Sequence, residues 1–128
     1  MSDEARIHSY LQIAKGTLEY KSAPVAFQAD IATEKGPSPG AFTAISTGNG
    51  TQISFANLST PALAVIHNFD DDNYVDFGIV VSATFYPVAE IQAGEHYIYR
   101  FSRNMNKNIF YIRANTASCD VSVEAFEA

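Results

Sequence analysis

The sequence predicts an all-β protein, an antiparallel two-sheet β-sandwich that is jelly-roll-like and has about nine to ten short strands. Three observations predict this class. Aromatic residues make up 12% of the 128 residues and accompany many Val, Ile and Thr, which favour strands over helices. Short apolar segments alternate with Gly-, Pro-, Asn- and Asp-rich turns at roughly 8–12-residue intervals. No helical crossover separates these segments, so the strands should pair mainly antiparallel.

The N-terminal segment, residues 1–22, is expected to form an arm or hairpin. Apolar residues between Ile7 and Ala14 have helical spacing, which leaves a helix as the alternative. Apolar and polar residues alternate, however, over residues 11–13 and again over residues 17–20, on either side of Gly16. Alternation on both sides of a glycine favours two strands joined by a turn.

The remaining chain, residues 23–128, is expected to form a single β-sandwich domain. Pro24 indicates a sheet edge, and Glu34–Gly40, which contains two prolines and two glycines, indicates a loop. Thr47–Gly50 is typical of a hairpin turn, because Gly and Asn tolerate positive φ. The expected strands are Ala23–Asp30, Phe42–Ser46, Gln52–Phe55, Leu63–His67, Tyr74–Val80, Phe85–Ile91, His96–Phe101, Ile109–Ala114 and Val121–Phe126.

Length, charge and apolar content exclude several classes of protein. The chain has the size of one domain. Its formal net charge of −6 disfavours nucleic acid as a partner, because such binding needs a basic face. No apolar run approaches the 18 or so residues that span a bilayer, so no membrane partner is expected. Cys119 is the single cysteine, which excludes an internal disulfide.

The motifs that could carry catalysis fail on inspection, so we expect no enzyme, no catalytic residue and no cofactor. Gly36–Gly40 has the letters of a GxSxG nucleophile elbow, but Pro39 follows the serine and has no N–H for an oxyanion hole. Cys119 has an acidic neighbour and no nearby histidine, which disfavours an activated thiolate.

Metal binding is also not expected. The three histidines, His8, His67 and His96, have no metal-ligand spacing. The acidic run Asp70–Asp72 could hold a hard cation, but it does not fit a calcium-loop pattern, and Asp and Asn are common in tight turns. We therefore interpret this run as a structural turn and leave a cation as the alternative.

One set of residues in the last third of the chain is a candidate protein–protein interface. Aromatic side chains alternate along the expected strands there, and arginines flank them. The alternatives are that the aromatic residues belong to the core, and that the cations either pair with surface carboxylates or form a small patch that binds an anion or nucleic acid. The candidate interface residues are Tyr97, Tyr99, Arg100, Arg103, Tyr111 and Arg113.

An ordered series of short motifs between Leu58 and Glu124 resembles small virion proteins of tailed bacteriophages. The series is Leu58–Leu63, Asn68–Asp70, Asn73–Gly78, Phe85–Pro87, Ala93–Glu95, Tyr99–Ser102, Ile112–Ala117 and Val121–Glu124. The first half of the chain matches more loosely, through residues 28–30 and 36–41. The resemblance implies a non-enzymatic, all-β building block of a phage particle and transfers no catalytic or metal-binding residue.

Within that resemblance, we expect a capsid decoration (cement) protein that stabilises the shell. Its expected partners are further copies of itself, as a homotrimer, and the major capsid protein or other virion proteins. Its expected location is the virion, on the capsid surface, after synthesis in the host cytoplasm. The alternative is a tail, neck or fibre-associated virion protein, including a module that binds host-surface glycans.

Overall fold

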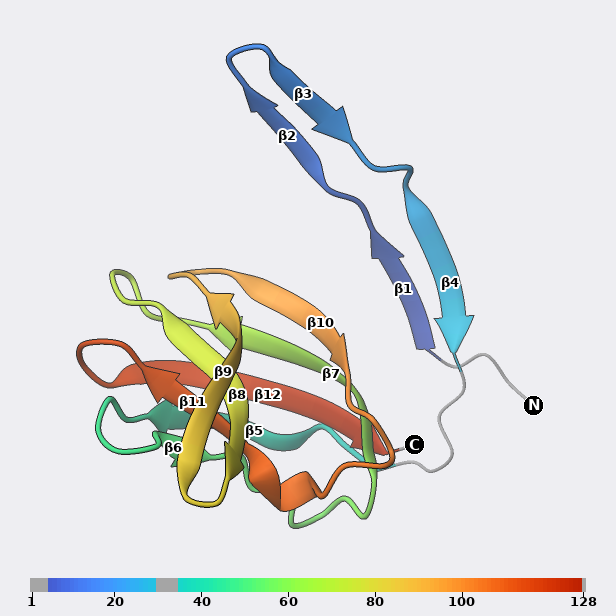
Figure 1. Cartoon of the computed structure of the whole chain (residues 1–128). Helices are drawn as coiled ribbons and strands as arrows, with labels where there is room; N and C mark the ends of the chain where they lie inside the picture. Colours follow the sequence, from blue (N-terminus) through green and yellow to red (C-terminus); the bar gives the residue numbers. More distant parts are fainter. Residues whose placement is uncertain (1–4, 30–34, 128) are drawn as a thin grey trace. The chain divides into compact units, whose positions relative to one another are not determined.

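The computed structural model describes residues 5–29 and 35–127 (Figure 1). Their regular elements are antiparallel strands and one short 3-10 helix, η1 (Lys107–Ile109), which confirms the all-β prediction. The chain divides into two compact units, Met1–Ala32 and Thr33–Ala128. The prediction instead placed the boundary after residue 22. Strand β4 (Val25–Ala29) belongs to the first unit because it pairs with β1 (Ala5–Ser9), a long-range pairing that alternation alone does not reveal.

The described part of the first unit, residues 5–29, is a two-stranded β-ribbon that we call the hairpin arm. Its base pairs β1 with β4, and its tip pairs β2 (Gln12–Lys15) with β3 (Leu18–Lys21). Gly16 has a φ of +58° in the two-residue turn at the tip, which is the conformation that favours glycine first in such a turn. The predicted hairpin over residues 11–20 is therefore confirmed, and the helical alternative is wrong.

The second unit is a sandwich of two four-stranded sheets, which we call the jelly-roll body. Sheet I has the strand order β10-β7-β12-β5, and sheet II has the order β6-β11-β8-β9. The strands are β5 (Ser38–Ala44), β6 (Thr51–Gln52), β7 (Pro61–Asn68), β8 (Val75–Val81), β9 (Thr84–Ile91), β10 (His96–Arg100), β11 (Phe110–Ala114) and β12 (Cys119–Glu127).

These strand orders are those of a jelly roll. Four of the six antiparallel pairs of the body are nested in the chain: β5 pairs with β12, β6 with β11, β7 with β10 and β8 with β9. Such nested pairing is what a long double-stranded ribbon gives when it rolls into two sheets. The described residues contain twelve strands rather than nine or ten, partly because the hairpin arm is interrupted near its middle and counts as four.

The predicted Gly/Pro loop is shorter than expected. Strand β5 begins at Ser38 and includes Pro39 and Gly40, so the second half of the expected loop is strand. A proline fits there because β5 pairs only with β12 and lies at the edge of sheet I. Residues 30–34, which include the beginning of that expected loop, lie outside the described residues.

Aromatic rings fill the space between the two sheets. Phe77 and Phe110 of sheet II stack with ring centroids 5.9 Å apart, and Phe101 meets Phe110 edge-on at 4.7 Å. Phe55, which follows β6, completes the cluster at 5.3 Å from Phe101. All four rings are buried. Such clusters supply much of the apolar area that stabilises a small body without disulfides.

Candidate interaction surfaces

The candidate interface residues of β10 lie at the border between core and solvent. Tyr99 is half-buried, and its ring centroid is 5.1 Å from that of Phe77, so this tyrosine belongs largely to the core. Tyr97 remains 45% exposed, and its hydroxyl donates a hydrogen bond to Oε1 of Glu95 at 2.9 Å. That bond raises the pKa of the Tyr97 phenol. Arg100 is exposed, and Arg103 is exposed in the turn after the strand.

The other two candidate residues lie in sheet II. Tyr111 and Arg113 alternate with the buried Phe110 and Ile112 on β11, so they face outward. The Arg113 guanidinium lies over the Phe85 ring at 4.5 Å. The structure thus divides the six residues among the interior, sheet I, a turn and the outer face of sheet II, and does not bring them together on one surface.

A charged row crosses the outer face of sheet II beside Arg113. Asp76 of β8 pairs across the sheet with Arg113 on one side and with Glu90 of β9 on the other. Partial burial and the neighbouring Glu90 carboxylate raise the pKa of Asp76, while Arg113 opposes this shift. Arg113 here offsets the charge of the neighbouring Asp76 carboxylate, which is a structural role for this cation.

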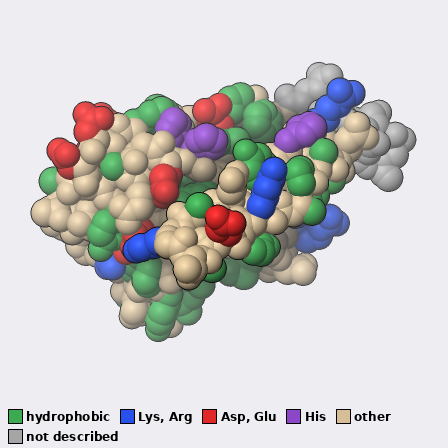
Figure 2. All heavy atoms as spheres, turned by 90° about the horizontal axis from the view of Figure 1, so that it is seen from above, with side chains coloured by type: hydrophobic (Ala, Val, Ile, Leu, Met, Phe, Trp, Pro, Cys, Tyr) green, Lys and Arg blue, Asp and Glu red, His purple; other side chains and the backbone are tan. Residues whose placement is uncertain are grey.

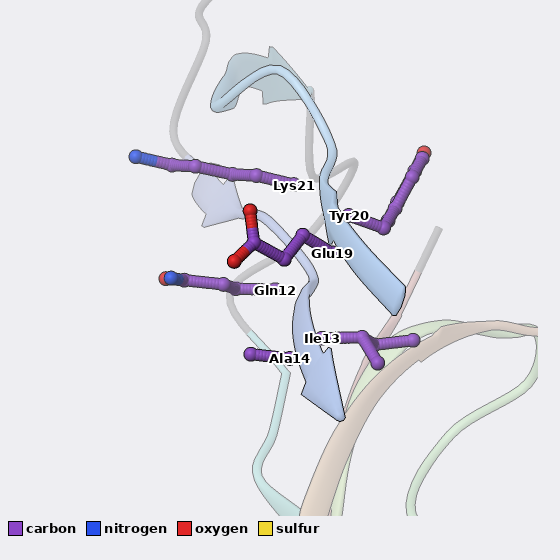
Figure 3. A pocket seen from close by; sticks show the side chains of 6 residues that line it. All are labelled: Gln12, Ile13, Ala14, Glu19, Tyr20 and Lys21. Carbon is purple, nitrogen blue, oxygen red and sulfur yellow. The ribbon is translucent and has the colours of Figure 1, made fainter. Parts of the chain in front are cut away.

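The tip of the hairpin arm has one apolar and one polar face. The register opposes Ile13 to Tyr20 and Lys15 to Leu18 on one face. Figure 3 shows Ile13 and Tyr20 pointing to one side of the ribbon, and Gln12, Glu19 and Lys21 to the other side. A shallow hollow lies against these residues. Only a two-stranded ribbon forms it, so it has no second layer that could enclose a small molecule.

The arm exposes an unusual amount of apolar side chain. Leu18 and Tyr20 are 58% and 53% exposed, although they lie on the apolar face. Figure 2 shows hydrophobic side chains at the surface of the molecule, interspersed with acidic, basic and histidine side chains. An isolated two-stranded hairpin is at best marginally stable in water, so such a ribbon gains stability when another surface covers it. The large exposed apolar side chains of the arm are Tyr10, Leu11, Ile13, Leu18, Tyr20, Val25 and Phe27.

Three of the four sheet edges of the body carry features that oppose pairing with another strand. The edge strand β5 contains Pro39, and β6 is only two residues long. The edge strand β9 contains Pro87 and a register shift opposite Phe77 and Gly78. Prolines, bulges and very short strands are the usual means of protecting sheet edges.

The fourth edge, β10, has no such feature and exposes apolar side chains. The N–H of Phe101 donates to the carbonyl of Ala62, and the N–H of Asn68 donates to that of Glu95. Alternate residues bond in an antiparallel ladder, so the backbone groups of Tyr97 and Tyr99 face β7. The backbone groups of residues 96, 98 and 100 therefore point away from sheet I. No other strand of the described residues pairs with this edge.

Two histidines that are distant in sequence meet on the outer face of sheet I. His67 of β7 and His96 of β10 are cross-strand partners with ring centroids 5.4 Å apart, and Phe69 is 4.1 Å from His67. Sequence spacing missed this pair because only the register of β7 and β10 brings the rings together. Among the described residues, no group of three or more His, Cys, Asp or Glu side chains is arranged to hold a metal ion.

The acidic run folds as a hydrogen-bonded turn, as interpreted. The Asp70 carboxylate accepts from the N–H of Asn73 at 2.7 Å and from that of Asp72 at 3.0 Å. These two bonds lower the pKa of Asp70. Asn68, which is fully buried, anchors the turn to the body through its side chain. The Asp70 carboxylate is thus engaged in local backbone contacts that are typical of aspartate in a tight turn.

Cys119 is fully buried, and its thiol lies 3.4 Å from the carbonyl oxygen of Ala117. Burial, with the nearby carboxylates of Asp70 and Asp120, raises the pKa of this thiol. The thiol is therefore a weak nucleophile at neutral pH, in agreement with the sequence argument.

Comparisons with known proteins identify no relative of this chain. No protein-family model, curated protein or solved structure matches the chain. Within the described residues there is also no helix of the length and apolarity needed to cross a membrane. The site is therefore defined by geometry alone: an amphipathic ribbon with an uncovered apolar face, and a jelly-roll body with one unprotected edge.

Proposed function

We propose that this protein is a structural subunit of a tailed-bacteriophage virion, a capsid decoration (cement) protein that acts as a homotrimer and performs no catalysis. Its partners are further copies of itself and the major capsid protein. Its location is the capsid surface, after synthesis in the host cytoplasm. The resemblance of the motifs between Leu58 and Glu124 to small phage virion proteins supports this proposal.

The single observation that carries the proposal is the hairpin arm. A ribbon with Leu18 and Tyr20 more than half exposed is poorly suited to remaining uncovered in water. A cement protein needs such an element, because it must bind neighbouring subunits through interfaces that bury about 800 Å² per partner. Long apolar and aromatic side chains on one face of a ribbon supply that kind of contact.

The jelly-roll body supports the same proposal more weakly. This architecture is common among viral capsid domains, but lectin domains use it too, so the architecture alone does not assign the function. What the body adds is a compact scaffold with an ordered aromatic core, from which the unprotected β10 edge is accessible to a partner strand.

The test is to determine where the protein lies on the particle and what it does there. Purified full-length protein is added to capsids assembled without it, and binding is measured by cosedimentation and by cryo-electron microscopy. We expect density at three-fold positions of the shell and an increase in the temperature at which the capsid releases its contents. Density confined to the tail, neck or fibres of the virion would overturn the capsid assignment. Absence of the chain from purified virions would overturn the proposal as a whole.

A further inference from the structure

The geometry points to a specific partner for the unprotected edge: we infer that strand β3 of one copy's hairpin arm adds to the β10 edge of a second copy. This inference rests on the proposed self-association and specifies its contact. It does not depend on which part of the virion holds the protein.

Charge favours binding of the arm tip of one copy to the body of another copy. The tip of the arm, residues 12–21, carries two cations, Lys15 and Lys21, against one carboxylate, Glu19, whereas the whole unit of residues 1–32 carries three cations against four carboxylates. Residues 35–127 of the body carry five cations against nine carboxylates. Two bodies therefore repel each other, whereas the tip of an arm and a body attract each other at short range.

The backbone of the arm tip presents the complementary groups. The N–H of Ser22 donates to the carbonyl of Leu11 at 2.8 Å, which fixes the alternation of the β2–β3 ladder. By the same alternation, residues 13 and 20 bond each other, as do residues 15 and 18. The backbone groups of Glu19 and Lys21 then point outward from β3. The corresponding outward groups on the body are those of residues 96, 98 and 100.

The side-chain faces match when these two edges join. Residues with outward backbone groups pair directly, so Glu19 and Lys21, on the polar face of the arm, fall beside the outer face of sheet I. Tyr20 and Leu18, on the apolar face, then fall on the inner side, next to Tyr99 and Phe101. Adding β3 to β10 thus extends both faces of sheet I: apolar side chains of the arm join the inner face, and polar side chains of the arm join the outer face, which is exposed to solvent.

One ion pair selects the strand and the register. Placing Glu19 opposite Arg100 puts Tyr20 opposite Tyr99 and Lys21 opposite Ile98 in an antiparallel pairing. Neither Glu19 nor Arg100 has an ion-pair partner among the described residues. The other edge of the arm tip, β2, offers Gln12 and Ala14 at the equivalent positions and no carboxylate. Strand β3 is therefore the better complement to a strand that carries arginine.

This contact is head-to-tail, because the arm and the β10 edge are different surfaces. A contact of that kind closes into a ring when the rotation between neighbours permits, which agrees with the proposed trimer. Each copy then donates one arm and accepts another.

A cysteine pair tests the contact directly in the full-length chain. In a Cys119→Ser background, Glu19→Cys and Arg100→Cys are combined, since directly paired strand residues have Cα separations that suit a disulfide. We expect mild oxidation to give a covalent trimer on non-reducing gels. Glu19→Cys with Arg113→Cys is the matched control, because Arg113 lies on the outer face of sheet II. An intramolecular disulfide in a monomer, or the same yield from the control pair, would overturn the inference.

A backbone variant tests the edge independently. Ile98→Pro removes an N–H that points away from β7, so it should leave the ladder with β7 intact while blocking the free edge. We expect analytical ultracentrifugation to show loss of the trimer, with the far-ultraviolet circular dichroism of the body retained. Ile98→Ala keeps the N–H and is expected to remain trimeric.

Charge reversal distinguishes this inference from the broader proposal. Glu19→Arg should weaken trimer formation about tenfold through three repeated contacts, and Arg100→Glu should restore it when combined with the first change. A wild-type trimer that none of these variants alters would overturn the arm contact and leave the proposed function standing. A wild-type protein that stays monomeric at high concentration and on capsids would overturn both.

Discussion

Replacing Asn68 by Ala will destabilise the jelly-roll body more than any ordinary surface substitution. Asn68 is 0% exposed at the end of β7. Its Nδ2 donates to the carbonyls of Asn73 at 2.9 Å and Ile91 at 3.1 Å, and its Oδ1 accepts from the N–H of Asp70 at 3.0 Å. One side chain therefore satisfies three backbone groups, two from the β7–β8 loop and one from the end of β9.

The size of the destabilisation depends on how accessible those three backbone groups are to water once the Asn68 side chain is removed. The Ile91 carbonyl belongs to a buried residue and cannot readily find water, so its loss costs about 1–3 kcal/mol. The groups of Asp70 and Asn73 are only part-buried, so each lost bond costs about 0.5–1.5 kcal/mol. The total is roughly 2–6 kcal/mol, which corresponds to a fall in Tm of about 8 °C or more for a body of this size.

The decrease in the free energy of unfolding is measured by thermal and urea unfolding of the full-length variant, with circular dichroism as the probe. Asn104→Ala is the matched control, because Asn104 is exposed in a turn and its side chain makes no hydrogen bond within the described residues. The control should unfold within about 0.5 kcal/mol of wild type. An Asn68→Ala protein that unfolds with the control would refute the reasoning that this amide holds the body together.

Three further predictions concern other parts of the body. Ala83→Gly should stabilise the protein by about 1 kcal/mol in urea unfolding, because Ala83 has a φ of +65° in the β8–β9 turn; an unchanged midpoint would contradict this. Cys119 should resist a disulfide-exchange reagent at pH 7 until urea unfolds the chain, since burial raises its thiol pKa; rapid labelling of folded protein would contradict the structure. Asp70→Ala should destabilise the protein at pH 7. A carboxyl group with a lowered folded pKa stabilises above its unfolded value of about 3.8 and loses that effect as the pH falls, so the two unfolding curves should converge in acid.

Local sequence signals were sufficient for the fold class and most turns. Gly16 marks the tip of the hairpin arm, and Asn49 and its neighbouring glycines mark the turn between β5 and β6, because backbone conformation at such sites depends on few residues. These features need no knowledge of which strands pair.

Features that depend on pairing could not be obtained in the same way. The strand at Val25–Ala29 joined β1 rather than the sandwich, because nothing local distinguishes one antiparallel partner from another. The aromatic set was divided for the same reason: Tyr99 faces Phe77 of the opposite sheet, while Tyr111 faces outward on sheet II. The free β10 edge and the His67–His96 pair likewise exist only once the strand order is fixed.

Three of the four sheet edges of the body are protected and one is not, and this difference limits how copies of the protein can associate through strand pairing at high local concentration. Unshielded strands on both sides of a sheet invite runaway stacking into fibrils. Here Pro39 and Pro87 close two borders, and the two-residue strand β6 offers too little backbone to template a third. Sheet-by-sheet polymerisation through the body therefore stops after one addition, and crowding of many copies is compatible with a soluble, finite assembly.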